Sequence, residues 1–389
     1  MTRWLALAIA IVTLFLAAWI FLPAPTYFLL TFGVGAPEVS AWIIVGALLG
    51  LAFAGVAMRT SAIAQIAAAC CLVALGLAST VLIRLPATLR RLDVAMRPVS
   101  AEPATPLRPR ALVVADLFRG ISLGDARVTH AVPFPLADGK TLTLEVYQPT
   151  HQSAPGGRHP IIVQIYGGAW QRGQPTDFAN FATWIASAGY VVFAIDYRHA
   201  PAARWAAQLD DVRSALAWIR DHAAEYDGDA TNIVLMGRSA GAHLALLAAY
   251  TPGPVTPRGV ISYYGPIDLV DAYEHPPHPD PLRIRSVEET FIGGTPEQMH
   301  DQYAAASPIS HVRAGSPPTL LIYGARDHIV EPRYGAQLAQ RLAAAGAPVA
   351  YLEIPWAEHA FDEVFSGVSS QLALYYTERF LAHVTAPPK

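Results

Sequence analysis

Cysteine and charge are both scarce in this sequence, and each shortage excludes a class of protein. Among 389 residues there are two cysteines, Cys70 and Cys71, and because they are adjacent they cannot cross-link distant segments. They belong to no spacing that predicts a metal site. Charged residues make up 15% of the chain, and the formal net charge is −3. A strongly basic protein that binds nucleic acid is therefore excluded.

Long apolar stretches are abundant at the N-terminus, and the mean hydropathy of the whole chain is +0.32. Residues 4–22, 41–58 and 61–83 contain no Asp, Glu, Lys or Arg, and each is near the ~20 residues that cross a bilayer. A cleaved secretory signal is the alternative for the first stretch, but it is longer than a usual signal core and two more stretches follow. We predict an integral membrane protein with three transmembrane helices in contact with lipid.

Arginines flank these stretches unevenly. Arg3 and Arg59 would share one side of the membrane, and the other side would hold Arg84, Arg90, Arg91 and Arg97. By the positive-inside rule this small excess favours a cytoplasmic C-terminal region, although such a cluster also serves to bind phospholipid headgroups. Residues 97–109 then contain four prolines, which predicts an extended linker. We divide the chain into a membrane anchor (1–85), an Arg/Pro-rich linker and lead-in (86–127) and a C-terminal domain (128–389).

The C-terminal domain alternates short apolar runs with amphipathic stretches, which predicts an α/β fold. Its sheet should be mostly parallel and covered by helices on both faces. The predicted strands are 141–147, 161–165, 191–195, 233–236, 259–263, 320–323 and 350–354, and the predicted helices are 177–188, 205–226, 240–250, 333–345 and 362–383.

The pentapeptide Gly237-Arg238-Ser239-Ala240-Gly241 lies where a predicted strand turns into a predicted helix. G-x-S-x-G at such a junction is typical of a nucleophile elbow, in which glycines permit a strained turn that exposes the serine hydroxyl. The alternative is a glycine-rich turn whose serine only caps the helix.

A second glycine motif, Tyr166-Gly167-Gly168-Ala169-Trp170, directly follows the predicted strand 161–165. Paired glycines let backbone N–H groups face a ligand without steric cost, although an ordinary glycine turn has the same composition. We predict an oxyanion hole formed by the N–H groups of Gly168, Ala169 and Ala240. The other members of the motif are predicted substrate contacts: Tyr166, Gly167 and Trp170.

An acid and a base follow the last two predicted strands. Asp327 comes after 320–323 and His359 comes after 350–354, so both should lie on the same sheet edge as Ser239. The chain order Ser, Asp, His predicts the catalytic triad Ser239–Asp327–His359. Simpler roles exist for both, because Asp327 could cap the next helix and a loop histidine is usually solvated.

Other polar residues near these motifs compete for the same roles. Glu358 could replace Asp327, although its adjacency to His359 disfavours a good hydrogen bond to that ring. His243 should pack within its helix, and His328 is less suitably placed than His359; Asp268 is a further candidate acid. We interpret Asp196-Tyr197-Arg198 as structural. We interpret Asp210 and Asp211 as part of a solvated helix face or as partners of Arg213 in an ion pair.

With these motifs in hand, residues 128–384 resemble the α/β hydrolase superfamily, in particular carboxylesterases of the hormone-sensitive-lipase and feruloyl/acetyl-xylan-esterase type. The supporting stretches are 166–170, 196–198, 237–241, 306–309, 324–330 and 359–361. The family loop usually begins with histidine where this chain has Tyr166, which changes the side-chain support of the loop. Three membrane spans are not general in the family. Residues 268–311 would form either a partial cap over the pocket or surface decoration.

The resemblance implies hydrolysis of a small-molecule carboxylic ester through an acyl-enzyme, with no metal or organic cofactor. Ser239 would attack, His359 would transfer the proton and Asp327 would orient the imidazole. An amidase, formamidase or peptidase with the same triad is the alternative. A non-catalytic, membrane-tethered binding protein is a third possibility. The sequence predicts neither the acyl chain nor the oligomeric state.

Overall fold

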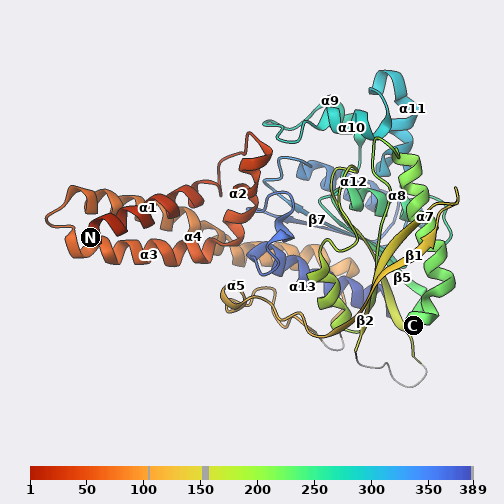
Figure 1. Cartoon of the computed structure of the whole chain (residues 1–389), viewed down its shortest axis with the longest axis horizontal. Coiled ribbons are helices and arrows are strands. Elements are labelled where there is room, and N and C mark those ends of the chain that lie inside the picture. The colour runs from red at the N-terminus through yellow and green to blue at the C-terminus, as the bar shows by residue number, and fades with distance from the viewer. Residues whose placement is uncertain (104–105, 151–156, 387–389) are drawn as a thin grey trace.

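A computed structural model of the chain describes residues 1–103, 106–150 and 157–386. Helices from the N-terminal third lie side by side and project from a domain that holds the sheet and the rest of the chain (Figure 1). The projecting helices are α1 (Thr2–Ala18), α3 (Ser40–Ala57) and the first part of α4 (Ala62–Met96). Figure 1 also shows α2 (Tyr27–Glu38) between this bundle and the sheet domain.

Small side chains allow the three projecting helices to pack closely. Each helix contacts the other two, and close approach of helices is typical where their facing positions are small. The buried facing residues are Ala6, Ala10, Ala17, Ala47, Ala54, Ala67, Ala74 and Ala78. Large apolar side chains point outward instead, among them Ile11, Leu72 and Ile83.

The predicted count of three membrane spans is corrected by the lengths of these helices. Among the described residues, only Ala62–Val99 form one continuous helix long and apolar enough to cross a membrane. A second candidate exists only if α2 and the following helix count as one span across an 80° bend. α1 has 17 residues, because the N–H groups of Trp19 and Ile20 turn back to the carbonyls of Leu16 and Ala17 and end the helix before the prolines.

The predicted linker is also more ordered than expected. α4 continues through Pro86 to Met96, so its arginines lie on a helix, and a 3₁₀ turn (η1, Arg97–Val99) follows. Arg108 is buried, and its backbone N–H donates to the carboxylate of Glu378 on α13 (Val368–Val384). This lead-in is therefore packed against the domain. Residues 104–105 of the predicted linker lie outside the described residues.

α2 docks on the domain through one buried carboxylate. Glu38, its last residue, accepts a hydrogen bond of 2.7 Å from the backbone N–H of Ser369 in the first turn of α13. A Cβ on Gly367 would lie 2.4 Å from Glu38 Oε2, so the approach requires glycine there. Burial raises the pKa of Glu38 to about 8. At the other end of α2, the guanidinium of Arg172 donates to the hydroxyl of Tyr27 at 2.7 Å.

The sheet confirms the predicted α/β class. In the described residues it has eight strands in the order β1-β2-β4-β3-β5-β6-β7-β8. β2 pairs antiparallel with both of its neighbours, β1 and β4, and all the other neighbouring strands pair in parallel. The strands are β1 (Ala126–Pro135), β2 (Thr141–Pro149), β3 (His159–Ile165), β4 (Val191–Ile195), β5 (Gly228–Arg238), β6 (Gly259–Tyr263), β7 (Thr319–Gly324) and β8 (Val349–Ile354). β1 was not predicted. Much of this edge strand is exposed, so its sequence shows only a weak alternation of apolar and polar residues.

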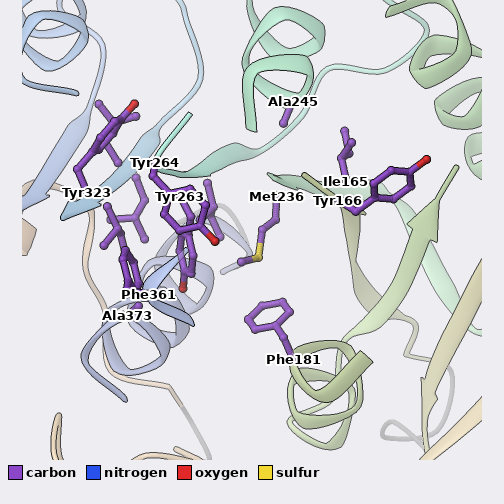
Figure 2. Packing of buried hydrophobic residues seen from close by; sticks show 14 of the residues in the cluster. Ile165, Tyr166, Phe181, Met236, Ala245, Tyr263, Tyr264, Tyr323, Phe361 and Ala373 are labelled. Atoms are coloured by element: carbon purple, nitrogen blue, oxygen red, sulfur yellow. The ribbon is translucent and has the colours of Figure 1, made fainter. Parts of the chain in front are cut away.

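Helices cover both faces of the sheet, as predicted. Figure 2 shows Phe181 of α6 and Ala245 of α8 on opposite sides of the strand that carries Met236. The covering helices and their short 3₁₀ neighbours are α6 (Ala179–Ser187), α7 (Trp205–His222), η2 (Ala223–Tyr226), α8 (Ala240–Tyr250), α12 (Pro332–Ala344), η4 (Phe361–Glu363) and α13. Outside this core lie α5 (Asp116–Arg119), α9 (Leu269–Glu274), α10 (Ile284–Ile292), α11 (Pro296–Ala306) and η3 (Pro308–His311).

Candidate active site

Ser239 occupies a strained turn between β5 and α8. Its φ is +51° and its ψ is −121°, a backbone conformation that residues other than glycine rarely adopt. The neighbouring glycines make this turn possible, since a Cβ on Gly237 would lie 2.2 Å from the carbonyl oxygen of Gly241. A Cβ on Gly241 would lie 2.3 Å from the carbonyl oxygen of Ile165 in β3. The local geometry is that of a nucleophile elbow.

Ser239, His359 and Asp327 form a continuous hydrogen-bonded chain. The Nε2 atom of His359 is 2.9 Å from the Oγ atom of Ser239, and its Nδ1 atom is 2.8 Å from the Oδ2 atom of Asp327. The Oδ1 atom of Asp327 accepts from the N–H groups of Ile329 and Val330 at 2.8 and 2.7 Å. When the Nδ1–H group of His359 donates to Asp327, the Nε2 lone pair faces the serine hydroxyl.

The competing residues have other partners. Glu358 Oε1 accepts from the backbone N–H of both His328 and His359, and its Oε2 contacts the His328 ring, a hydrogen bond that raises the pKa of His328. His243 Nε2 bonds to the carbonyl oxygen of Ala306 at 2.7 Å, and complete burial lowers the pKa of that imidazole to about 3. Asp268 caps α9 by accepting from the N–H of Asp271.

The glycine loop after β3 lies beside the serine. Gly168 has a φ of +128°, and a Cβ there would lie 2.1 Å from the carbonyl oxygen of Arg172, so only glycine fits. Gly168 and Ala169 border the same cavity as Ser239 and His359. Ala240 is the first residue of α8, and an N–H group at that position has no acceptor within its own helix. The three predicted oxyanion donors are thus grouped around the serine.

Tyr166 lies behind this loop and not on the cavity wall. It is buried, its hydroxyl donates to the carboxylate of Asp196 and contacts His199 Nε2 at 3.0 Å, and its ring stacks on Tyr197. The Tyr197 hydroxyl in turn donates to the Tyr166 carbonyl oxygen at 3.2 Å. Of the three predicted substrate contacts, Gly167 and Trp170 border a pocket, whereas the Tyr166 hydroxyl points to Asp196.

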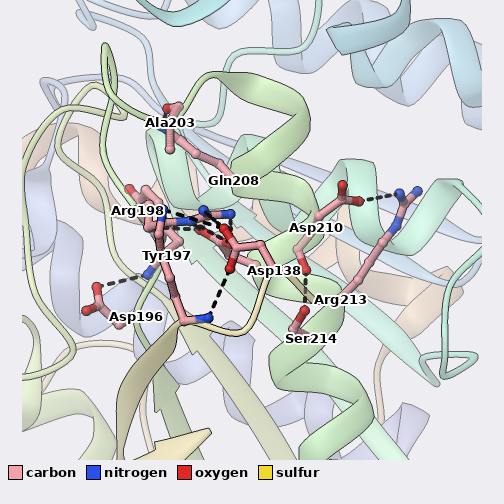
Figure 3. Close-up of polar contacts among 11 residues, drawn as sticks. Asp138, Asp196, Tyr197, Arg198, Ala203, Gln208, Asp210, Arg213 and Ser214 are labelled. Atoms are coloured by element: carbon pink, nitrogen blue, oxygen red, sulfur yellow. Dashed lines mark hydrogen bonds and ion pairs between the residues drawn. The ribbon is translucent and has the colours of Figure 1, made fainter. Parts of the chain in front are cut away.

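The neighbouring Arg198 anchors the end of β4, in agreement with a structural role for this motif. Its guanidinium donates to both carboxylate oxygens of Asp211. It also donates to the carboxylate of Asp138 (Figure 3). Asp211 is 1% exposed, so its reading as a solvated residue or a partner of Arg213 is wrong. Asp210 is the residue that pairs with Arg213, at 3.2 Å.

Two pockets meet at Ser239. One is narrow and largely apolar and is bordered by Trp170, Ile267, Leu282, Ile284, Val287 and Ile329. The other is larger and is bordered by His359 together with Tyr27, Gly167, Arg172, Arg238 and Glu363. Four residues of the predicted cap or decoration line the first pocket and so form part of its wall: Leu282, Ile284, Val287 and Glu288. No cluster of three or more His, Cys, Asp or Glu that could hold a metal occurs in the described part of the chain.

Sequence motifs did not reveal the walls supplied by α2 and α10. Tyr27 reaches the larger pocket from α2, and Glu288 reaches the apolar pocket from α10. Neither residue lies in a recognisable motif. An amphipathic pattern in 284–292 could have indicated the helix, but not which of its residues face the serine.

Known proteins resemble the sheet domain. A probable carboxylic ester hydrolase, LipM of Mycobacterium tuberculosis, is 32% identical over 246 residues, which are 59% of this chain and 56% of that protein. Esterase LipQ of the same organism is 32% identical over 60% of this chain and 61% of its own length. The chain thus spans less than two thirds of the curated relatives that it matches.

Solved structures show the same fold. An esterase of Thermogutta terrifontis is 26% identical with a TM-score of 0.51, over 62% of this chain and 85% of that chain. An esterase of Pyrobaculum calidifontis, at 21% identity and a TM-score of 0.58 over 66% and 85% of the two chains, supports the fold alone. The α/β hydrolase fold expected from the motifs is confirmed. Residues 144–342 match the BD-FAE family, and the chain belongs to that family.

Proposed function

We propose that this protein is a carboxylic ester hydrolase that forms an acyl-enzyme on Ser239. The observation that carries the proposal is the hydrogen-bonded chain from Ser239 through His359 to Asp327. The names of the relatives agree with it, since LipM and LipQ are an ester hydrolase and an esterase. The Thermogutta terrifontis esterase 2 has also been solved phosphonylated by sarin.

The reaction begins when His359 Nε2 takes the proton of the Ser239 hydroxyl and the Oγ atom attacks the ester carbonyl. The developing negative charge on the carbonyl oxygen is stabilised by the N–H groups of Gly168, Ala169 and Ala240, and one such donor contributes roughly 10² to 10³ in rate. His359 then protonates the departing alcohol. Water, deprotonated by His359, then attacks the carbonyl of the acyl-enzyme. The acid is released, and His359 returns the proton to the Ser239 oxygen.

In this proposal the two pockets take different parts of the ester. The leaving alcohol has to lie within reach of Nε2 to receive its proton, so the pocket that His359 borders takes the alcohol. The apolar pocket is bordered by Ser239 and Trp170 but not by His359, and it takes the acyl chain. Residues 128–389 are accordingly the catalytic domain in this proposal.

An amidase or peptidase with the same triad can be distinguished from an esterase by the leaving group that it releases, an amine in place of an alcohol. We expect the full-length protein in detergent to hydrolyse short p-nitrophenyl esters well above the spontaneous rate and to leave the matching p-nitroanilides intact. Turnover of anilides as fast as esters would instead assign an amidase. Absence of turnover on both, in folded protein, would favour a non-catalytic binding protein.

The N-terminal helices attach the domain to a membrane in this proposal. Leu72, Val56 and Ile83 are 58%, 74% and 74% exposed on the bundle, and apolar surface of this kind is stabilised by lipid contact. α4 is the candidate span. Its C-terminal half carries Arg84, Arg90 and Arg91, and by the positive-inside rule the catalytic domain lies on the cytoplasmic side.

A charge placed on the lipid-facing side of α4 tests this attachment. We expect the native chain to stay in the membrane pellet through an alkaline carbonate wash and to require detergent for release. Leu72→Arg should increase the washed-off fraction, because an arginine at the centre of a span costs about 2.5 to 3.5 kcal/mol. Val114→Arg is the matched control, since Val114 is equally exposed but outside the bundle. Release of the native chain by carbonate alone would contradict membrane insertion.

A further inference from the structure

One acidic side chain lies in the otherwise apolar wall of the acyl pocket. Glu288 projects from α10, borders the pocket together with Leu282, Ile284 and Val287, and is 1% exposed. Its Oε2 atom is buried and has no hydrogen-bond partner in the described part of the protein. The mechanism above does not use this group.

The surroundings of Glu288 favour the neutral form of its carboxyl. Burial raises its pKa well above the ordinary value, and the nearby carboxylates of Asp268 and Asp280 raise it further. Both neighbours are occupied, since Asp268 accepts from the N–H of Asp271 and Asp280 accepts from the N–H of Ile284 at 2.9 Å. A neutral carboxyl presents one O–H donor and one C=O acceptor.

An unpartnered polar group in an apolar wall is unfavourable for the empty protein. Leaving a buried donor or acceptor unsatisfied costs stability, whereas a leucine of similar size would complete the apolar lining. The cost is removed when a ligand supplies the missing hydrogen bond. Glu288 therefore has the properties of a recognition group that is satisfied only in the substrate complex.

We propose that the acyl pocket selects acyl chains that carry a hydroxyl group, which hydrogen-bonds to Glu288. This inference rests on the proposed esterase function and names the substrate class of that site. A hydroxyl both donates and accepts, so it matches a neutral carboxyl. An acyl chain with a second carboxylate would be repelled by Asp268 and Asp280. An ammonium group would lose its hydration in an apolar pocket and meet a carboxyl whose neutral form is favoured there.

The test compares matched substrates that differ by one oxygen atom. Ethyl esters of butanoic and hexanoic acid are compared with those of 3-hydroxybutanoic, 5-hydroxyhexanoic and 6-hydroxyhexanoic acid, with acid release followed by pH-stat titration on the full chain. At the position where the hydroxyl reaches Glu288, we expect kcat/KM for the hydroxyacyl ester to exceed that of the plain ester by about tenfold, the effect of one satisfied buried hydrogen bond.

Three variants separate recognition from a structural role. Glu288→Leu should abolish the hydroxyacyl preference while plain hexanoate is still hydrolysed, and Glu288→Gln should retain most of the preference. Glu289→Gln is the control, because Glu289 lies next in α10 but accepts from the Tyr273 hydroxyl outside the pocket. A parallel change of both substrate series in Glu288→Leu would mean that the residue only supports the fold.

Other outcomes would overturn the inference while the esterase proposal stands. Equal kcat/KM for plain and hydroxylated esters in the native protein would exclude hydroxyl recognition. Faster turnover of the 6-aminohexanoate ester than of the 6-hydroxyhexanoate ester would assign Glu288 to a cation instead. Absence of hydrolysis of every ester would contradict the proposed function itself, so the two failures are distinguishable.

Discussion

Replacement of Ser239 by alanine is expected to abolish covalent labelling by a fluorophosphonate and to lower kcat for ester hydrolysis by about 10⁶-fold. The reason is that the Oγ atom supplies the bond to the acyl group, and no neighbouring side chain occupies its place at the β5–α8 turn. Residual rate would come from the oxyanion donors and from substrate binding. In-gel fluorescence of the labelled protein and initial rates on a p-nitrophenyl ester measure both effects.

The control for this variant is another serine changed in the same way. Ser214 lies on α7, where its hydroxyl donates to the carbonyl oxygen of Asp210, and Ser214→Ala should label and turn over as the native protein does. Melting temperatures of both variants should stay close to the native value. Persistent labelling of folded Ser239→Ala would show that a different nucleophile reacts, and the acyl-enzyme proposal would be abandoned.

The elbow, the glycine loop and the order of the proposed triad residues could be predicted because each depends on a few neighbouring residues. A glycine on either side of Ser239 is required by contacts of 2.2 and 2.3 Å, and such a requirement appears in the sequence as a fixed spacing. Asp327 and His359 each follow a strong apolar strand, so their common sheet edge followed from topology. Their catalytic roles stay predictions until the variants are measured.

Features that depend on burial by distant segments could not be predicted. Asp211 looked like a solvated helix residue, yet Arg198 reaches it from the loop after β4 and buries it. Glu38 and Glu288 are ordinary acids in the sequence, and only the packing of α2 on α13 and of α10 over the pocket makes them unusual. The predicted lengths of the membrane helices were wrong for a related reason. Helix ends depend on local turns, which hydropathy does not report.

Replacement of Asp327 by asparagine should lower kcat by about 10⁴-fold with little change in stability. The Asp327 Oδ1 atom accepts from the N–H groups of Ile329 and Val330, so the amide oxygen of an asparagine would take these two bonds. The NH₂ group would then face His359 Nδ1 and donate to it. That arrangement places the ring proton on Nε2, which can no longer accept the proton of Ser239.

Glu358→Gln is the matched comparison, because Glu358 contacts the His359 backbone and the His328 ring but not the His359 ring nitrogens. We expect this variant to lose less than about tenfold in kcat, since its effect is limited to the position of a loop. Steady-state kcat on one p-nitrophenyl ester, with circular dichroism to verify folding, measures both variants. Near-native turnover in Asp327→Asn together with a large loss in Glu358→Gln would transfer the orienting role to Glu358. The reverse result would tie the rate to the tautomer of His359, because each substitution removes one negative charge close to His359 and only Asp327 faces a nitrogen of its ring.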